Sequence, residues 1–311
     1  MKGMALARAY FDEYGAVMID REFAHYKSVM AVGLVGEGSE CFGYDDALSQ
    51  DHDFGPGFCI WLPRAVVVQD GARIARAYEN LPKEFRGFRR LESAQAGHRV
   101  GLWAIEDFYA KYTGLDHPPR DNMEWFHIPE TFLATCTNGE VFWDEPGLFT
   151  QWRNILLDFY PQDVVKKKLA ARCALMAQSG QYNYGRSLRR GDTQAAYLAV
   201  SLFVQHALAA IYLLNGRYMP YYKWGFRGAA ELYDLRGSVE KLVRLTTLAD
   251  TAADAKEKEA LIESVCVDIV QALNVRGYSR SSEAFLQVQA EELMRSIEDS
   301  RLRALHIMAD A

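Results

Sequence analysis

The sequence has no excess of basic residues. Of its 311 residues, 35 are lysine or arginine and 41 are aspartate or glutamate, which gives a formal net charge of −6 and a pI near 5.7. Proteins that bind DNA as their main activity usually carry a basic face and a high pI. The composition therefore argues against a general DNA-binding protein, although it is compatible with a local basic groove.

Cysteine is also scarce. The five cysteines are scattered along the chain, odd in number, and never spaced as Cys-x-x-Cys. This pattern excludes a disulfide framework and argues against a zinc site. The first eight residues run directly into a charged amphipathic stretch, without the features of a signal peptide. We expect reduced thiols and a cytoplasmic location.

Only one apolar run is long enough to span a bilayer. Residues 195–214 are nearly all apolar, but Gln205 and His206 lie at their centre, where lipid would make both side chains costly. The flanks also lack aromatic and basic belts on both sides. We therefore predict a buried helix of a bundle, with His206 as a core histidine, and no association with a membrane.

Hydrophobic residues make up 50% of the chain and aromatic residues 13%, enough apolar surface for a folded core. The length favours two domains or one large one. The first half is mixed. Apolar spacing predicts helices over 4–30, 70–82 and 106–112, and short strands over 32–36, 58–62 and 100–105. Asn138-Gly139, before the apolar segment 141–143, favours a type I′ hairpin turn.

From about Thr150 onward, glycine and proline thin out and helical periodicity dominates. We predict long helices over 150–179, 191–215, 228–247, 254–275 and 281–307, with Asp192 or Thr193 as the cap of the second. The fold class is thus α+β, with a mixed-sheet domain over 1–150 and an all-helical bundle domain over 151–311. Substrates would bind in a cleft between the domains.

The chemistry concentrates between the first two predicted strands. The first strand opens into Gly36-Glu37-Gly38-Ser39, and Asp51-His52-Asp53 comes shortly before the second. Gly38 lets the backbone approach a phosphate, and the Ser39 amide and hydroxyl can donate to it. On an extended backbone Asp51 and Asp53 point to one side, where two close carboxylates call for a cation such as Mg²⁺.

Each piece also has a plain structural interpretation. A single Asp-x-Asp is usually solvated, and a single Gly-x-Gly-Ser is usually a tight turn. Asp45, Asp46 and Asp51 could form an ordinary acidic loop. The order of the pieces, each beside a strand, favours the functional interpretation over the structural one.

Gly-Ser followed by Asp-x-Asp resembles the signature of the nucleotidyltransferase fold, as in aminoglycoside and minimal nucleotidyltransferases. The wider sequence resembles a bacterial family of unknown function with a nucleotidyltransferase-like front half and a helical back half. The segments that carry this wider resemblance, besides the stretch from Gly38 to Pro56, are Gln181–Tyr184, Arg186, Arg189–Asp192, Tyr212–Asn215, Tyr218 and Pro220–Trp224.

The resemblance implies that Gly38 and Ser39 hold a nucleoside triphosphate and that Asp51 and Asp53 are catalytic ligands of Mg²⁺. ATP is the expected nucleotide, and its nucleoside monophosphate would pass to a small-molecule, protein or RNA acceptor. A third carboxylate is expected on a later strand. Here the strand over 100–105 contains no acid, and Gly101 stands at the expected position, with only Glu106 and Asp107 following.

The lack of a third carboxylate on this strand argues against catalysis more strongly than against nucleotide binding. The alternative is a nucleotide-binding regulator, or a partner-binding module of the toxin–antitoxin type, without turnover. Two carboxylates could still hold one Mg²⁺ in such a protein.

Two cations in the helical half complete the predicted site. Lys223, with Arg227 one turn on and aromatic residues around it, could face the triphosphate. Arg186 could bind a phosphate of the nucleotide or of a polynucleotide acceptor. The structural alternatives are an aromatic loop between helices for Lys223 and a solvated helix end for Arg186.

Overall fold

The structure, a computed structural model, describes residues 1–49, 54–90, 99–249 and 251–310. The chain forms two compact units. Unit 1 comprises Met1–Pro118 and Phe132–Asp158, and unit 2 comprises Pro119–Thr131 and Phe159–Ala311.

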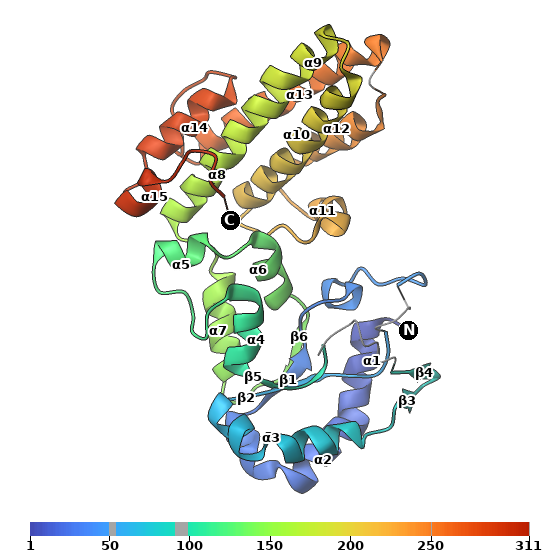
Figure 1. Cartoon of the computed structure of the whole chain (residues 1–311). Coiled ribbons are helices and arrows are strands. Elements are labelled where there is room, and N and C mark those ends of the chain that lie inside the picture. Colours follow the sequence, from blue (N-terminus) through green and yellow to red (C-terminus); the bar gives the residue numbers. More distant parts are fainter. Residues whose placement is uncertain (50–53, 91–98, 250, 311) are drawn as a thin grey trace. The chain divides into compact units, whose positions relative to one another are not determined.

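Unit 1 contains a mixed four-stranded sheet in the order β5-β2-β1-β6 (Figure 1). The central strand β1 runs antiparallel to both β2 and β6, while β2 and β5 are parallel. The strands are β1 (Ala31–Leu34), β2 (Cys59–Leu62), β5 (Gly101–Ala104) and β6 (Glu140–Trp143); a separate hairpin consists of β3 (Glu84–Phe85) and β4 (Phe88–Arg89).

Helices cover the sheet of unit 1. They are α1 (Gly3–Tyr10), a π-helical segment (Phe11–Gly15), α2 (Ala16–Glu22), α3 (Arg64–Glu79), α4 (Ile105–Thr113) and α7 (Leu148–Leu157), with 3₁₀ turns at Ala24–Val29 and Ser39–Phe42. Along β2, Ile60 and Leu62 belong to a core that includes Tyr10 and Phe58. Trp61, which points to the other face of the strand, stacks on Phe149 with ring centroids 4.0 Å apart.

Unit 2 is helical. Its elements are α5 (Asn122–Phe126), α8 (Gln162–Met176), a π-helical segment (Ala177–Tyr184), α9 (Gly185–Arg189), α10 (Thr193–Leu214), α11 (Tyr222–Ala229), α12 (Arg236–Thr247), α13 (Ala252–Val275), α14 (Leu286–Arg295) and α15 (Ser300–Ala304); α6 (Glu130–Cys136) joins the two units. Helix α10 packs on α8, α12 and α13 within unit 2.

Helix α10 is long and apolar enough to cross a membrane by length and composition, and 67% of its most apolar window is buried in the protein. It is the core helix that the sequence predicts. The Asp192 carboxylate caps it by accepting a hydrogen bond from the Ala195 amide at 2.9 Å.

The fold class is confirmed: an α+β part with a mixed sheet precedes a helical part. The segment predicted as one helix over 150–179 is interrupted before Pro161, which cannot continue a helix from the preceding turn. The segment 228–247 is interrupted near Leu235, whose φ is 62°. The segment 281–307 contains two shorter helices, the second capped by Asp299.

The predicted hairpin at Asn138-Gly139 was wrong. The residues before the turn form helix α6, and the strand after it, β6, pairs with β1. The turn with positive φ at both central residues lies instead at Arg86 (50°) and Gly87 (80°), between β3 and β4.

Candidate functional site

The loop that follows β1 has a backbone suited to holding an anion. Gly36 and Gly38 adopt φ of 128° and 124°, a region that L side chains rarely enter. Ser39 then begins a 3₁₀ turn. The backbone N–H groups of Gly38 and Ser39 and the Ser39 hydroxyl donate to no other described residue. Three donors are therefore available at this loop.

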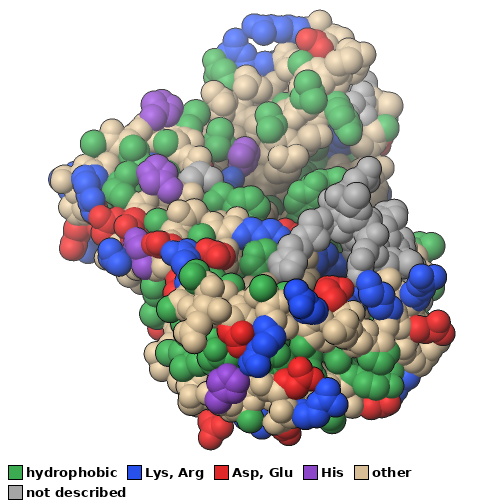
Figure 2. Space-filling view, turned by 60° about the horizontal axis from the view of Figure 1, so that its bottom comes forward, with side chains coloured by type: hydrophobic (Ala, Val, Ile, Leu, Met, Phe, Trp, Pro, Cys, Tyr) green, Lys and Arg blue, Asp and Glu red, His purple; other side chains and the backbone are tan. Residues whose placement is uncertain are grey.

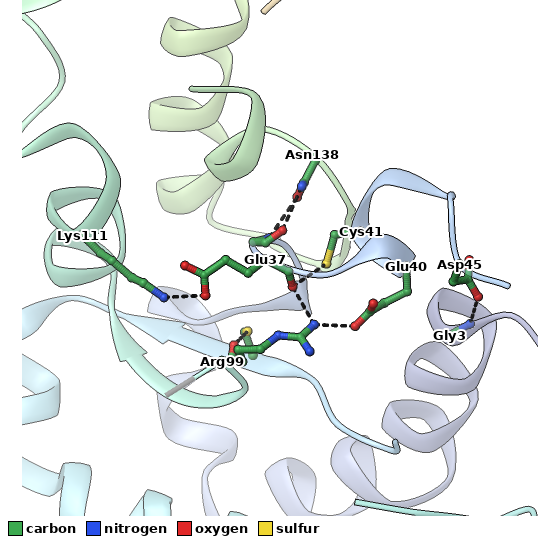
Figure 3. Close-up of polar contacts among 10 residues, drawn as sticks. Gly3, Glu37, Glu40, Cys41, Asp45, Arg99, Lys111 and Asn138 are labelled. Carbon is green, nitrogen blue, oxygen red and sulfur yellow. Dashed lines mark hydrogen bonds and ion pairs between the residues drawn. The ribbon is translucent and has the colours of Figure 1, made fainter. Parts of the chain in front are cut away.

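The sheet topology brings a cation to the same loop. Because β1 is antiparallel to β2 and β2 is parallel to β5, the end of β1 and the starts of β2 and β5 lie at one edge of the sheet. Arg99 lies two residues before β5. Its Nη2 atom donates to the Glu37 carbonyl oxygen at 2.6 Å and pairs with the Glu40 carboxylate (Figure 3). An added Cβ at Gly38 would lie 2.2 Å from this Nη2 atom.

A second cation reaches the loop from α4. The Lys111 Nζ atom lies 2.9 Å from Glu37 Oε2, and its ammonium group lies 5.6 Å from the centre of the Trp103 ring. Arg99 thus pairs with Glu40 and Lys111 pairs with Glu37, so that the charges of these four side chains sum to zero (Figure 3). The Lys111 pair is partly exposed, so its carboxylate can be exchanged for another anion at little cost.

Asn138 fixes the end of β1. Its amide oxygen accepts from the Gly36 N–H and its amide nitrogen donates to the Gly36 carbonyl, both at 2.9 Å. Arg153 in turn donates to the Asn138 carbonyl at 2.7 Å. Asn138 thus makes the two hydrogen bonds to Gly36 that a neighbouring strand would make, beyond the last residue pair of the ladder between β1 and β6.

The two predicted metal ligands, Asp51 and Asp53, lie outside the described residues. Two other acids of the same stretch have structural roles. Asp45, only 3% exposed, accepts from the Gly3 amide at 2.8 Å at the start of α1 and pairs with Lys2. The Asp46 carboxylate accepts hydrogen bonds from the backbone N–H groups of Leu48 and Ser49 in its own turn. For these two residues the structural interpretation is correct.

The predicted third carboxylate is absent from β5, all of whose residues the structure describes. Gly101 pairs in register with Cys59, the first residue of β2, and its φ of 99° suits glycine. Glu106 and Asp107 follow β5 at the opposite end. Glu106 accepts from the Arg64 amide at 2.9 Å, and Asp107 lies 2.7 Å from the Arg64 guanidinium. Both acids are therefore remote from the edge that carries Ser39.

The structure does not bring Arg186 and Lys223 together. Arg186 lies on α9, next to Asp192 at the start of α10. Lys223 lies on α11, which is attached near the other end of α10, because the Tyr212 hydroxyl of α10 donates to the Gly225 carbonyl of α11 at 2.7 Å. From Asp192 to Tyr212 the axis of α10 extends about 30 Å. Figure 1 shows α9 and α11 at opposite ends of α10.

Each of these two cations has a local aromatic partner. The Arg186 guanidinium lies 4.5 Å from the centre of the Tyr182 ring and donates to its hydroxyl. The Lys223 ammonium lies 4.4 Å from the centre of the Trp224 ring. One triphosphate cannot contact both cations, since each side chain spans well under half of the distance between them.

The surface agrees with the acidic composition. Over most of the face in Figure 2, Lys and Arg side chains are interspersed with Asp and Glu side chains.

Burial raises the pKa of every thiol, including that of Cys41, whose Sγ atom donates to the Glu37 carbonyl in the loop. All five cysteines are free and buried. Burial raises the pKa of Cys59 to about 12, and its Sγ atom donates to the Arg99 carbonyl at 3.3 Å. A thiol with this pKa is not a nucleophile at neutral pH.

Sequence reasoning missed Arg99, Lys111 and Asn138. Arg99 directly precedes a predicted strand, which is a usable signal only once the order of the strands is known. Asn138 was interpreted through its own turn, although its side chain serves β1. Lys111 carries no signal in the sequence beyond its place on a predicted helix.

Comparison with known proteins gives a family match over part of the chain and a distant structure. Residues 125–225 match a domain of unknown function (DUF4037). No curated protein matches the chain. A solved structure of a nucleotidyltransferase-like protein from Exiguobacterium sibiricum 255-15 aligns over 90% of this chain and 89% of its own, with 13% identity and a TM-score of 0.37.

Proposed function

We propose that this protein binds a nucleoside triphosphate with Mg²⁺ at the loop after β1 and transfers the nucleoside monophosphate to an acceptor. The observation that carries the proposal is the set of donors on Gly38 and Ser39 that have no partner among the described residues, held at the sheet edge where Arg99 and Lys111 converge. ATP is the nucleotide we expect. Asp51 and Asp53 are the proposed metal ligands.

The described neighbour of Asp53 supports this placement. An added Cβ on Gly3 would lie 3.0 Å from the Phe54 ring and 2.6 Å from the Glu40 Cβ atom. Phe54 therefore packs beside the same 3₁₀ turn that Ser39 begins. Phe54 thus lies next to the proposed phosphate loop.

The residues of this chain would act by positioning and by neutralising charge. The amides of Gly38 and Ser39 would hold phosphate oxygens, and Arg99 and Lys111 would exchange Glu40 and Glu37 for the phosphates. Mg²⁺ bound by Asp51 and Asp53 would neutralise charge on the reacting phosphate. The acceptor would be a small molecule, a protein or an RNA end.

A second candidate is nucleotide binding without turnover, as in a regulator or a toxin–antitoxin-like partner module. The specific observation in its favour is Gly101, a backbone position suited to glycine where a third carboxylate is expected. Both candidates use the same binding loop, so binding and chemistry have to be measured separately.

Isothermal titration calorimetry with the four ribonucleoside triphosphates and Mg²⁺ tests binding. We expect saturable binding that weakens at least tenfold in Asp51→Asn/Asp53→Asn and in Ser39→Ala, but not in the control Asp46→Asn, whose carboxylate serves its own turn. Release of pyrophosphate on prolonged incubation would favour the transferase, and binding without release would favour the regulator. Equal affinity in all variants would overturn the proposed site.

A further inference from the structure

Unit 2 buries a cluster of three cations on one helix. Lys167 and Lys168 on α8 are fully buried, and Arg172 follows one turn later with 17% of its side chain exposed. The lysine ammonium groups lie against the Phe126 ring, at 5.6 Å and 5.4 Å from its centre. A positive charge buried in this way requires negative charge or oxygen ligands nearby.

The oxygens come largely from the segment after α15, residues 306–310. Lys167 Nζ donates to the carbonyl oxygens of Ile307 at 3.2 Å and Ala309 at 2.6 Å. The Asp310 carboxylate is divided between two cations, with Oδ1 2.9 Å from Lys168 Nζ and Oδ2 2.6 Å from Arg172 Nη2. Four oxygens of one short segment thus occupy the cluster.

The segment itself has few other anchors. Its single turn is closed by the Ala309 amide and the His306 carbonyl, and residues 307–310 are half-buried. Glu130 supplies the other carboxylate, 3.3 Å from Arg172. Without residues 306–310, three cations would face that carboxylate among the described residues.

The compensation within the cluster is incomplete even with the segment in place. Among the described residues, Glu130 Oε2 and Arg172 Nε are buried without a hydrogen-bond partner. The pKa of Lys167 is lowered to about 8, chiefly by burial and in smaller part by Lys168, against the opposing effect of Asp310. Among the described residues, the three cations of the cluster therefore face two carboxylates, those of Glu130 and Asp310, and polar atoms are left over.

We propose that this cluster is a binding site for a phosphate-bearing small molecule and that residues 306–310 occupy it as an internal competitor. The two Asp310 oxygens mark where two phosphate oxygens would lie, one on Lys168 and one on Arg172. The remaining phosphate oxygens would accept hydrogen bonds from Lys167. In the structure Lys167 donates instead to the backbone carbonyls of Ile307 and Ala309. Arginine and lysine are the side chains best suited to this exchange.

The site is independent of the proposed nucleotide loop, since all its residues belong to unit 2. Its ligand class follows from the donors alone: three cationic side chains carried by one helix, α8, favour an anion with several oxygens over a monocarboxylate. A ligand would release residues 306–310, and removal of Asp310 would open the site.

The test is calorimetric titration of the full chain with inorganic phosphate, pyrophosphate and a nucleoside monophosphate, at constant ionic strength set with chloride. Asp310→Asn removes the competing charge, and we expect it to bind at least one of these anions at least tenfold more tightly than wild type. Adding Lys168→Met should abolish the gain. Preference for the monophosphate over inorganic phosphate would identify an ester as the ligand.

Glu257→Gln is the matched control, because it makes the same change of charge at a surface pair with Arg244 in unit 2. Hydrogen exchange of wild type gives a second measurement that needs no variant: amides of residues 300–310 should exchange faster at saturating pyrophosphate. Equal affinities of Asp310→Asn and Glu257→Gln, together with unchanged exchange in wild type, would overturn the proposal and leave the segment as a structural anchor.

Discussion

The side-chain amide of Asn138 is hydrogen-bonded to both backbone groups of Gly36, each at 2.9 Å. Asn138 comes from the turn between α6 and β6, whereas Gly36 begins the proposed phosphate loop. A residue about a hundred positions away in the sequence therefore holds the first glycine of that loop, and its loss should affect both stability and binding.

Asn138→Asp keeps the acceptor and replaces the donor with a carboxylate oxygen facing the Gly36 carbonyl. We expect it to lower the free energy of unfolding by about 1–3 kcal/mol, as expected for a buried polar group left unpaired. Asn138→Ala should cost less than Asn138→Asp, because it adds no repulsion. Urea denaturation of both variants measures the difference, and a more stable Asp variant would disprove the pairing.

Glu40 competes with a phosphate for Arg99. Replacing Glu40 with Gln should release the guanidinium and strengthen nucleoside triphosphate binding by roughly threefold to tenfold, since a partly buried charge pair is worth about 1 kcal/mol. Arg99→Met should weaken binding to a similar or greater extent. Titration calorimetry of the two variants should show opposite changes in affinity; changes of the same sign would contradict the exchange.

Arg186 and Lys223 lie near opposite ends of α10, so at most one of them can contribute to nucleotide affinity. We expect Arg186→Met and Lys223→Met to differ, with one variant binding Mg²⁺-nucleotide as wild type does. A large and equal loss of affinity in both variants would contradict the separation that the structure shows.

His206 provides a test of the buried cluster through pH. Burial, reinforced by Arg172, lowers the pKa of His206 from 6.5 to about 4, while Asp310 acts in the opposite direction. Because the unfolded chain takes up the proton first, stability is full above pH 6.5 and falls as the pH drops toward 4. The shift in the pKa of His206 corresponds to about 1–3 kcal/mol over this range.

His206→Gln should remove that part of the pH dependence. Urea midpoints of wild type and variant between pH 7.5 and 4.5 provide the comparison, and the difference between the two curves cancels the carboxylates that titrate in both. Parallel curves would mean that His206 is protonated in the folded protein at the same pH as in the unfolded chain.

The periodic segments of the sequence were sufficient to predict the main elements. Short apolar runs predicted β1, β2 and β5 to within two residues, and the apolar run over α10 predicted a core helix with Asp192 or Thr193 as its cap, of which Asp192 is the cap found. Breaks within long helical patterns were harder to place. At Leu235 the chain adopts a positive φ in a residue that gives no such warning in the sequence.

The site depended on contacts that a single sequence does not reveal. Gly38 and Ser39 were identifiable because a strand leading into Gly-x-Gly-Ser has a local physical meaning. Arg99 and Lys111 reach the loop only because β5 lies beside β2 and α4 follows β5, which is a property of strand order. The sequence analysis did not single out the cluster on α8, because only the tertiary structure shows that residues 306–310 cover it.

Thermal unfolding with Mg²⁺ and a panel of nucleoside triphosphates tests the central claim most directly. A ligand at 100 times its dissociation constant adds about 2.7 kcal/mol to the native state, which raises the midpoint by several degrees for a protein of this size. We predict a Mg²⁺-dependent rise in wild type, largest with ATP, that is at most about half as large in Asp51→Asn/Asp53→Asn and in Ser39→Ala. No rise with any nucleotide, or an equal rise in the double variant, would contradict the account.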